Sequence, residues 1–210
     1  MSQYNIIAES AEYTVVSEYE HAVSTSEAYQ SEAELEKEFI RLLGEQGYEY
    51  LPIHTEADLV SNLRTSLEKL NDYHFTDNEW EHFFNECIAN KNDDIVAKTA
   101  RIQEDYIQVL KRDNGESRNI YLIDKKNIHN NFVQVINQYV EEGGSYDTRY
   151  DVTVLVNGLP LVHIELKRRG VQLKEAFNQI NRYQRDSFWA GSGLYEYVQI
   201  FVISNGTNTK

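Results

Sequence analysis

The chain has 210 residues, 41% of them hydrophobic, with 15 tyrosines and 8 phenylalanines, a composition that excludes disorder and allows a substantial core. The single cysteine, Cys87, excludes an internal disulfide. Because the sequence has no long apolar run, we expect no transmembrane helix and no secretory signal, and therefore a cytoplasmic protein without a membrane partner. The net charge of −14 disfavours strong nucleic-acid binding by the chain as a whole.

The first predicted helix begins near residue 31, after thirty polar residues without a clear element. Ser31 and Glu34 match a capping box, in which side chains accept hydrogen bonds from free backbone N–H groups at the start of a helix. Apolar residues then recur every three or four positions until Gly44 and Gly47 end the pattern. We therefore expect an amphipathic helix over 31–46.

Three more helices are predicted to follow in succession. Leucines at helical spacing mark 58–71, and Thr76 with Glu79 forms a second capping box ahead of another apolar stretch. A further helical pattern covers about 93–103. Because these helices follow one another directly, we expect residues 56–104 to be a helical insertion in a domain that spans 1–210.

Beyond this helical region the apolar period changes from 3.6 to 2 residues, which indicates strands. In chain order the predicted elements are a hairpin over 106–123, strands over 132–140, 149–156 and 161–167, a helix over 173–187, and a strand over 198–203. The last strand is almost continuously apolar, so we expect it to be covered on both faces. The predicted fold is an α/β domain with a central mixed sheet over about 106–206, flanked by the first and last helices.

Three charged residues stand among the apolar residues of two adjacent predicted strands: Asp151, Glu165 and Lys167. Burying an ionised group in a sheet costs free energy unless the group is paired or binds a metal, so such groups often mark a functional site. Two carboxylates supply oxygen ligands of the kind that Mg²⁺ prefers, and a lysine could orient or help to deprotonate an attacking water. Such spacing also arises in ordinary surface ion pairs, so the spacing alone is a weak signal.

The turn between the two strands decides whether the carboxylates can cooperate, because a slip of one residue moves a side chain to the other face. A three-residue loop over 157–159 would place Asp151 opposite Glu165, whereas a two-residue turn would pair Asp151 with Ile164. A shared site therefore requires either the odd loop or a bulge. Glu165 and Lys167 share a face in either case.

The segment RYDVTVLVNGLPLVHIELKRRG, residues 149–170, resembles the N-terminal nuclease region of the restriction subunit (HsdR) of type I restriction-modification enzymes. These belong to the PD-(D/E)xK superfamily of RecB-like nucleases. The resemblance continues through 175–183 and 200–206 and reaches back to 31–36 and 120–124. It implies a restriction-endonuclease-like fold.

The resemblance also implies roles for individual residues. Asp151 and Glu165 would bind Mg²⁺, for which Mn²⁺ can substitute, with the backbone carbonyl of Leu166 as a further ligand and Lys167 as the catalytic lysine. Tyr150 stands where the family usually has proline, which does not alter the ligand chemistry.

Two more elements of the family pattern lie on the flanking helices. Gln179 and Tyr183 match a QxxxY element and, being four residues apart, share a helix face from which they could hydrogen-bond a scissile phosphate or Lys167. Either Glu32 or Glu36 would be the first-helix carboxylate directed toward the metal. The sequence does not choose between them.

The positive charge of the chain is concentrated after the acidic motif. Residues 165–185 contain six lysines or arginines and only two glutamates, so a local cationic surface is expected despite the acidic total. The histidines lack the spacing of a zinc site. His163 lies two residues before Glu165 on the same face and could approach the site, although a sheet histidine with satisfied hydrogen bonds is the favoured interpretation.

The expected function is Mg²⁺-dependent endonucleolytic cleavage of double-stranded DNA, with the methyltransferase and specificity subunits of a restriction complex as partners. The chain has no GxxxxGK[ST] phosphate loop, so ATP would act only through helicase lobes outside it, and we expect a nuclease domain from a larger translocase subunit. Two alternatives stay open: a non-catalytic docking or coupling module, and a stand-alone RecB-like exonuclease or junction resolvase.

Overall fold

The structure is a computed structural model that describes residues 6–9, 14–16, 31–141 and 148–210. Its centre is a five-stranded mixed sheet in the order β3-β6-β7-β8-β9. The strands are β3 (Glu49–Tyr50), β6 (Val133–Glu141), β7 (Thr148–Val156), β8 (Leu159–Leu166) and β9 (Ile200–Ser204). The three central strands are antiparallel, and each edge strand runs parallel to its neighbour. The predicted α/β class is confirmed.

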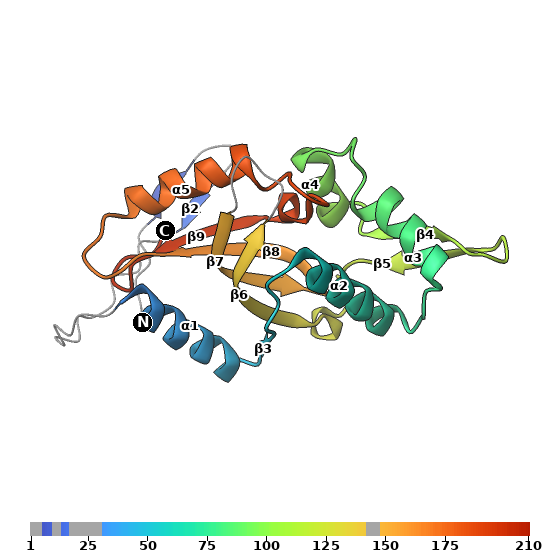
Figure 1. The fold of residues 1–210 in the computed structure, drawn as a ribbon, viewed down its shortest axis with the longest axis horizontal. Coiled ribbons are helices and arrows are strands. Elements are labelled where there is room, and N and C mark those ends of the chain that lie inside the picture. Colours follow the sequence, from blue (N-terminus) through green and yellow to red (C-terminus); the bar gives the residue numbers. More distant parts are fainter. Residues whose placement is uncertain (1–5, 10–13, 17–30, 142–147) are drawn as a thin grey trace.

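Two helices lie on opposite faces of the sheet, as Figure 1 shows. Helix α1 (Glu32–Glu45) begins with the predicted capping box of Ser31 and Glu34, and its Leu43 packs with sheet residues such as Val152. Helix α5 (Leu173–Asp186) covers the other face, where Ala176 and Ile180 pack against β9. Burial of one apolar stripe per helix thus creates a three-layer arrangement.

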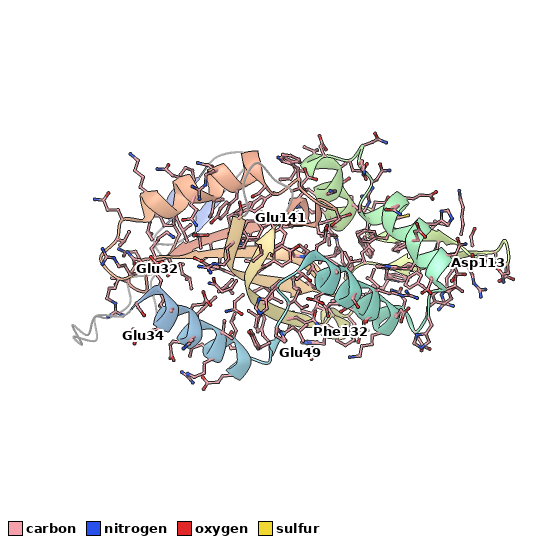
Figure 2. All side chains as sticks on the ribbon, in the orientation of Figure 1. Glu32, Glu34, Glu49, Asp113, Phe132 and Glu141 are labelled. Atoms are coloured by element: carbon pink, nitrogen blue, oxygen red, sulfur yellow. The ribbon has the colours of Figure 1, made fainter. Side chains whose placement is uncertain are left out.

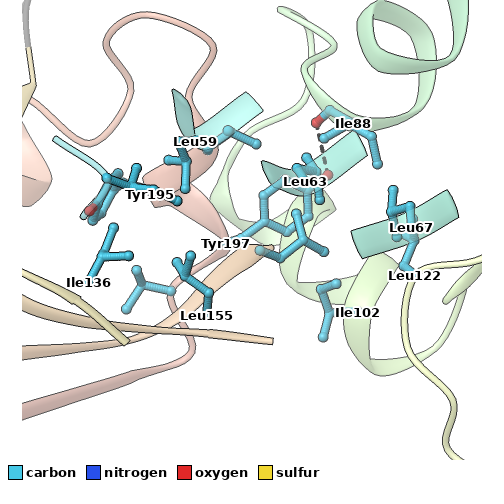
Figure 3. Packing of buried hydrophobic residues seen from close by; sticks show 14 of the residues in the cluster. Leu59, Leu63, Leu67, Ile88, Ile102, Leu122, Ile136, Leu155, Tyr195 and Tyr197 are labelled. Atoms are coloured by element: carbon cyan, nitrogen blue, oxygen red, sulfur yellow. Dashed lines mark hydrogen bonds between the residues drawn. The ribbon is translucent and has the colours of Figure 1, made fainter. Parts of the chain in front are cut away.

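The helical region lies at the end of the sheet away from the start of α1 (Figure 1). It comprises α2 (Glu56–Asn71), α3 (Asp77–Phe83), the π-helical η1 (Phe84–Ile88) and α4 (Ile95–Gln103). Figure 3 shows α2 placing Leu59, Leu63 and Leu67, all fully buried, against sheet residues and the 3₁₀ helix η3 (Leu194–Tyr197). The predicted helices are confirmed, and the interpretation of 56–104 as an insertion stays a prediction.

The predicted hairpin over 106–123 forms, but outside the central sheet. Strands β4 (Ile107–Lys111) and β5 (Ser117–Tyr121) make a separate two-stranded sheet. The prediction that it belongs to the central sheet was wrong because its apolar residues, such as Leu110 and Ile120, are buried in the same core as α2. In the described part of residues 1–30, β1 (Ile6–Glu9) pairs with β2 (Thr14–Val16). Much later in the chain, a short 3₁₀ helix, η2 (Ile128–Asn130), precedes β6.

The last strand, β9, is an edge strand, and the prediction that both of its faces are covered is confirmed for most of its length. Val202 packs in the cluster on the α1 side, whereas Phe201 and Ile203 pack with α5 on the other side. Ile200 is 55% exposed, while Ile203 is buried. The segment that follows folds back along the outer edge, where Lys210 and Ile203 exchange two backbone hydrogen bonds. An apolar run reports the hydrophobicity of a strand, but an edge position depends on which other strands pair with it.

The turn between β7 and β8 resolves the register question. Asn157 and Gly158 form a two-residue turn with φ of 52° and 84°, so the three-residue loop was wrong. A bulge follows, because Leu155 pairs with Pro160 while Val154 pairs with Val162. The bulge supplies the extra residue that a shared carboxylate site requires.

Past the bulge, Val152 pairs with Ile164. Continuation of this register places Asp151 opposite Glu165, as the bulge alternative predicted.

None of the helices in the described ranges has the length and apolar character needed to span a bilayer.

Replacing Gly158 by alanine is expected to destabilise the domain by about 2–4 kcal/mol. The left-handed φ of 84° disfavours a side chain, and an added Cβ would lie 2.5 Å from the Cα of Leu63 on α2. Urea denaturation measures the loss. Gly115→Ala is the matched control: Gly115 has the same φ of 84° but open space around it, so it should cost about 1 kcal/mol. Equal losses for the two variants would contradict the packing argument.

Candidate metal-dependent nuclease site

The three charged residues of the central strands come together at the end of β8. Glu165 is 0% exposed, and its Oε1 accepts a hydrogen bond from Lys167 Nζ at 3.0 Å. The Asp151 carboxylate accepts one from the backbone N–H of Leu166 at 2.9 Å. The structure thus joins both strands at one point through charged groups, and Glu165 and Lys167 share a face as predicted.

Burial and charge perturb the carboxylate of Asp151. Its pKa is raised to about 7, first because burial disfavours the charged form and second because the negative charge of Glu165 lies nearby. For Lys167, burial lowers the pKa, but the attraction of Glu165 outweighs it, so the pKa is raised and the ammonium form is favoured. The carboxyl groups of Asp151 and Glu165 and the ammonium group of Lys167 therefore interact strongly with one another.

The residues at this point fit a hard divalent cation. Oε2 of Glu165 is buried without a hydrogen-bond partner in the described structure, and a second carboxylate, that of Asp151, lies close enough to repel it. A cation between the carboxylates would relieve both costs. Within the described ranges, no three His, Cys, Asp or Glu side chains converge as a complete ligand set. Mg²⁺ suits such a site, since it usually binds one or two carboxylates and retains waters.

The two glutamates of α1 have different partners. Glu32 lies at the start of α1, at the end of the sheet where β8 finishes (Figure 2), and its Oε1 accepts a hydrogen bond from the backbone N–H of Arg168 at 3.2 Å. Glu36 instead accepts hydrogen bonds from Asn137 and Gln138 of β6. Of the two, the structure brings Glu32 next to the charged residues, since Arg168 directly follows Lys167.

Gln179 and Tyr183 share one face of α5, as the four-residue spacing predicted. The side-chain amide of Gln179 donates to the Tyr183 hydroxyl, which itself donates to the carbonyl of Arg149 at 3.3 Å. Burial and the charge of Glu165 raise the pKa of Tyr183 to about 12. The pair therefore lies near the carboxylates, and its proposed contacts with Lys167 or a phosphate stay predictions.

His163 differs from its interpretation as a satisfied histidine. It is 0% exposed, and neither ring nitrogen has a hydrogen-bond partner among the described residues. Its Nε2 is 3.5 Å from Glu165 Oε2, and aromatic rings, including Tyr150 and Phe188, surround it. The position two residues before Glu165 was the available sequence signal, but the missing partners depend on the aromatic packing.

A cationic pocket of about 580 Å³ opens beyond the end of β8. Arg169, Lys174 and Lys210 line it, together with amide and hydroxyl groups that include Asn205 and Thr207, and its described lining contains no acidic side chain. It begins two residues after Lys167. Arg169 and Lys174 belong to the predicted local cationic surface, so part of that surface lines a pocket beside the candidate site, in a chain of net charge −14.

The sheet, its flanking helices and the buried charges define a mixed α/β domain consistent with a restriction-endonuclease-like fold. The model of the family described as type I restriction enzyme R protein N terminus matches residues 29–210. The chain therefore belongs to this family.

Curated relatives agree with this assignment. The chain is 47% identical over 205 residues to the type I restriction enzyme EcoprrI endonuclease subunit of Escherichia coli, covering 97% of this chain and 65% of that subunit. It is 41% identical over 187 residues to the SsaAORF53P endonuclease subunit of Staphylococcus saprophyticus, covering 87% of this chain and 19% of that subunit. The chain thus spans only part of the length of both relatives.

Asp151→Asn is expected to stabilise the metal-free chain at pH 8 by roughly 1–3 kcal/mol. The pKa of Asp151 rises from 3.8 to about 7 on folding, so the wild type loses stability as pH rises through that window, whereas the amide does not titrate. Thermal unfolding in EDTA at pH 4 and pH 8 measures the difference. The gain should shrink toward pH 4, and an equal gain at both pH values would contradict the burial argument.

Proposed function

We propose that the chain is the Mg²⁺-dependent endonuclease module of a type I restriction enzyme motor subunit, and that it cleaves double-stranded DNA by attack of water on a phosphodiester. The observation that carries this proposal is the group formed by the buried Glu165 and the half-buried Asp151 and Lys167, in which one carboxylate oxygen of Glu165 has no hydrogen-bond partner among the described residues. Membership of the restriction-subunit family supports the reaction class.

Each residue has a chemical role in this proposal. Asp151, Glu165 and the carbonyl of Leu166 would hold Mg²⁺, with Glu32 as a further candidate; the ion, when bound, supplies Lewis acidity toward phosphate and water. Burial of Glu165 excludes competing solvent from its oxygens. Since the pKa of Lys167 is raised, its ammonium group would act by charge, orienting the water and offsetting the negative charge that develops on the phosphate.

The DNA would approach across the cationic pocket. Lys174 and Lys210 carry positive charge to the edge of the candidate site, so a phosphate next to the scissile one could be held there. Gln179 and Tyr183 would contact the scissile phosphate or Lys167 from α5. The acidic remainder of the chain implies that most DNA affinity comes from other parts of the enzyme.

ATP and the partner subunits enter only through the complete enzyme. We propose that ATP is used by helicase lobes outside residues 1–210, and that methyltransferase and specificity subunits provide site recognition. The similarity to endonuclease subunits of which this chain spans 65% and 19% supports a module within a larger motor subunit.

Asp151→Ala, Glu165→Ala and Lys167→Ala are each expected to abolish cleavage of closed circular DNA by the assembled enzyme, a loss of at least 100-fold, because each removes a ligand or the charge at the reacting phosphate. ATP hydrolysis should persist. Glu38→Ala, at an exposed α1 residue paired with Arg41, is the matched control and should cut normally. Near-normal cleavage by any of the three site variants would refute the assignment.

The same assay separates the alternatives. An exonuclease or resolvase would require DNA ends or junctions, so cleavage of closed circles contradicts that function. A docking module would retain partner binding and cleavage after Asp151→Asn, whereas a nuclease should lose cleavage and its divalent-metal site.

Lys174→Ala is expected to weaken DNA binding by the full-length subunit and to reduce the slope of log affinity against log salt by about 0.9, the value for one phosphate contact. Competition binding at several salt concentrations measures the slope. Lys91→Ala, at an exposed lysine of the helical region, is the control and should leave the slope unchanged. Identical slopes for Lys174→Ala and the wild type would show that the pocket does not hold a phosphate.

A further inference from the structure

Strand β7 changes face at Asp151. Residues two apart on a regular strand point to the same side. Val152 packs toward α1 with Leu43, yet Tyr150 packs toward α5 with Tyr183. The residue between them, Asp151, is therefore where the strand departs from alternation, and this irregularity contributes to the direction of its carboxylate.

Strand β6 changes face at the same level. Asn137 points toward α1, where it contacts Glu36, whereas Tyr139 lies on the other side and stacks on Tyr150. Gln138 between them has a φ of 52°, a left-handed conformation that is unfavourable for a residue other than glycine. The β6–β7 pairing includes the positions on either side but omits Gln138, which lies opposite Asp151 in register.

Glu36 of α1 holds this irregular turn of β6. Its Oε1 accepts a hydrogen bond from Asn137 Nδ2 at 2.6 Å, and its Oε2 accepts one from Gln138 Nε2. Neighbouring residues of a regular strand point to opposite faces, so the left-handed Gln138 explains how both donors can lie on the α1 side. Asn137 is fixed further by Tyr50, whose hydroxyl donates to Oδ1 at 2.9 Å, and by His54, whose Nδ1 is 3.1 Å from the carbonyl oxygen.

We propose that Glu36 is a positioning residue for the metal site: it stabilises the left-handed Gln138, which sets the face change of β7 and so aims Asp151 at the N–H of Leu166 and toward Glu165. The importance of this role for catalysis rests on the proposed function, but the effect of Glu36 on the position of the Asp151 carboxylate can be measured separately. It also assigns the two α1 glutamates different tasks, since Glu32 contacts the backbone beside Lys167 while Glu36 acts through β6.

The first readout is the exchange protection of the Leu166 amide, measured by NMR on the metal-free 210-residue chain. This N–H donates to Asp151, so its protection reports the position of that carboxylate. Glu36→Ala should lower the protection at least tenfold, while Glu38→Ala, the control two residues along the same helix, should leave it within twofold. Unchanged protection in Glu36→Ala overturns the proposal.

The second readout is Mn²⁺ affinity, measured by calorimetry and defined as the binding that Asp151→Asn removes. Glu36→Ala should weaken it about tenfold, in the range typical of residues that orient metal ligands. Glu36→Gln, which can accept from only one of the two amides, should give an intermediate loss.

A rescue variant separates positioning from general destabilisation. Glycine adopts the left-handed conformation without strain, so adding Gln138→Gly to Glu36→Ala should recover at least threefold in both protection and Mn²⁺ affinity. No recovery, or losses that merely follow the melting temperature, overturns the proposal. If the wild type shows no Asp151-dependent Mn²⁺ binding, the proposed nuclease function fails, while the Leu166 amide still decides the role of Glu36.

Discussion

The candidate site depends on one constraint, a register that keeps together two carboxylates on adjacent strands, one of them buried and the other half-buried. A plain two-residue turn between β7 and β8 would separate Asp151 from Glu165, and the bulge after Pro160 restores their alignment. The result is an electrostatically costly arrangement, since one carboxylate has a pKa raised to about 7 and the other has an oxygen without a partner. Such a cost in a well-packed sheet is characteristic of a functional site.

The rest of the fold holds this register in place. The turn at one end of the two strands packs so closely against the backbone of α2 that a side chain at position 158, which is Gly158, would not fit. At the other end, α1 and α5 cover opposite faces and bring Glu32 and Tyr183 toward the carboxylates (Figure 1). The helical region and the site therefore lie at opposite ends of the same strands, connected by a rigid sheet.

Much of the architecture could be predicted because local patterns reflect local physics. The capping boxes at Ser31 and Thr76 formed as expected, since each of two side chains three residues apart accepts a hydrogen bond from the other residue's free backbone N–H group. The hairpin over 106–123 was misplaced because sheet membership depends on distant partners. The favoured interpretation of His163 was wrong for the same reason, as the rings around it come from β7, from α5 and the residues just after it, and from β9.

By itself, the sequence determined which elements form and that Asp151, Glu165 and Lys167 are the charged residues of two apolar strands, because periodicity and residue chemistry are properties of neighbouring positions. Only the tertiary structure decided that a bulge, not an odd loop, brings the acids together, and that Glu32 contacts the backbone beside Lys167 while Glu36 contacts β6. These choices required packing of α1 and α2 on the sheet, and such packing depends on contacts between residues more than a hundred positions apart in the case of α1.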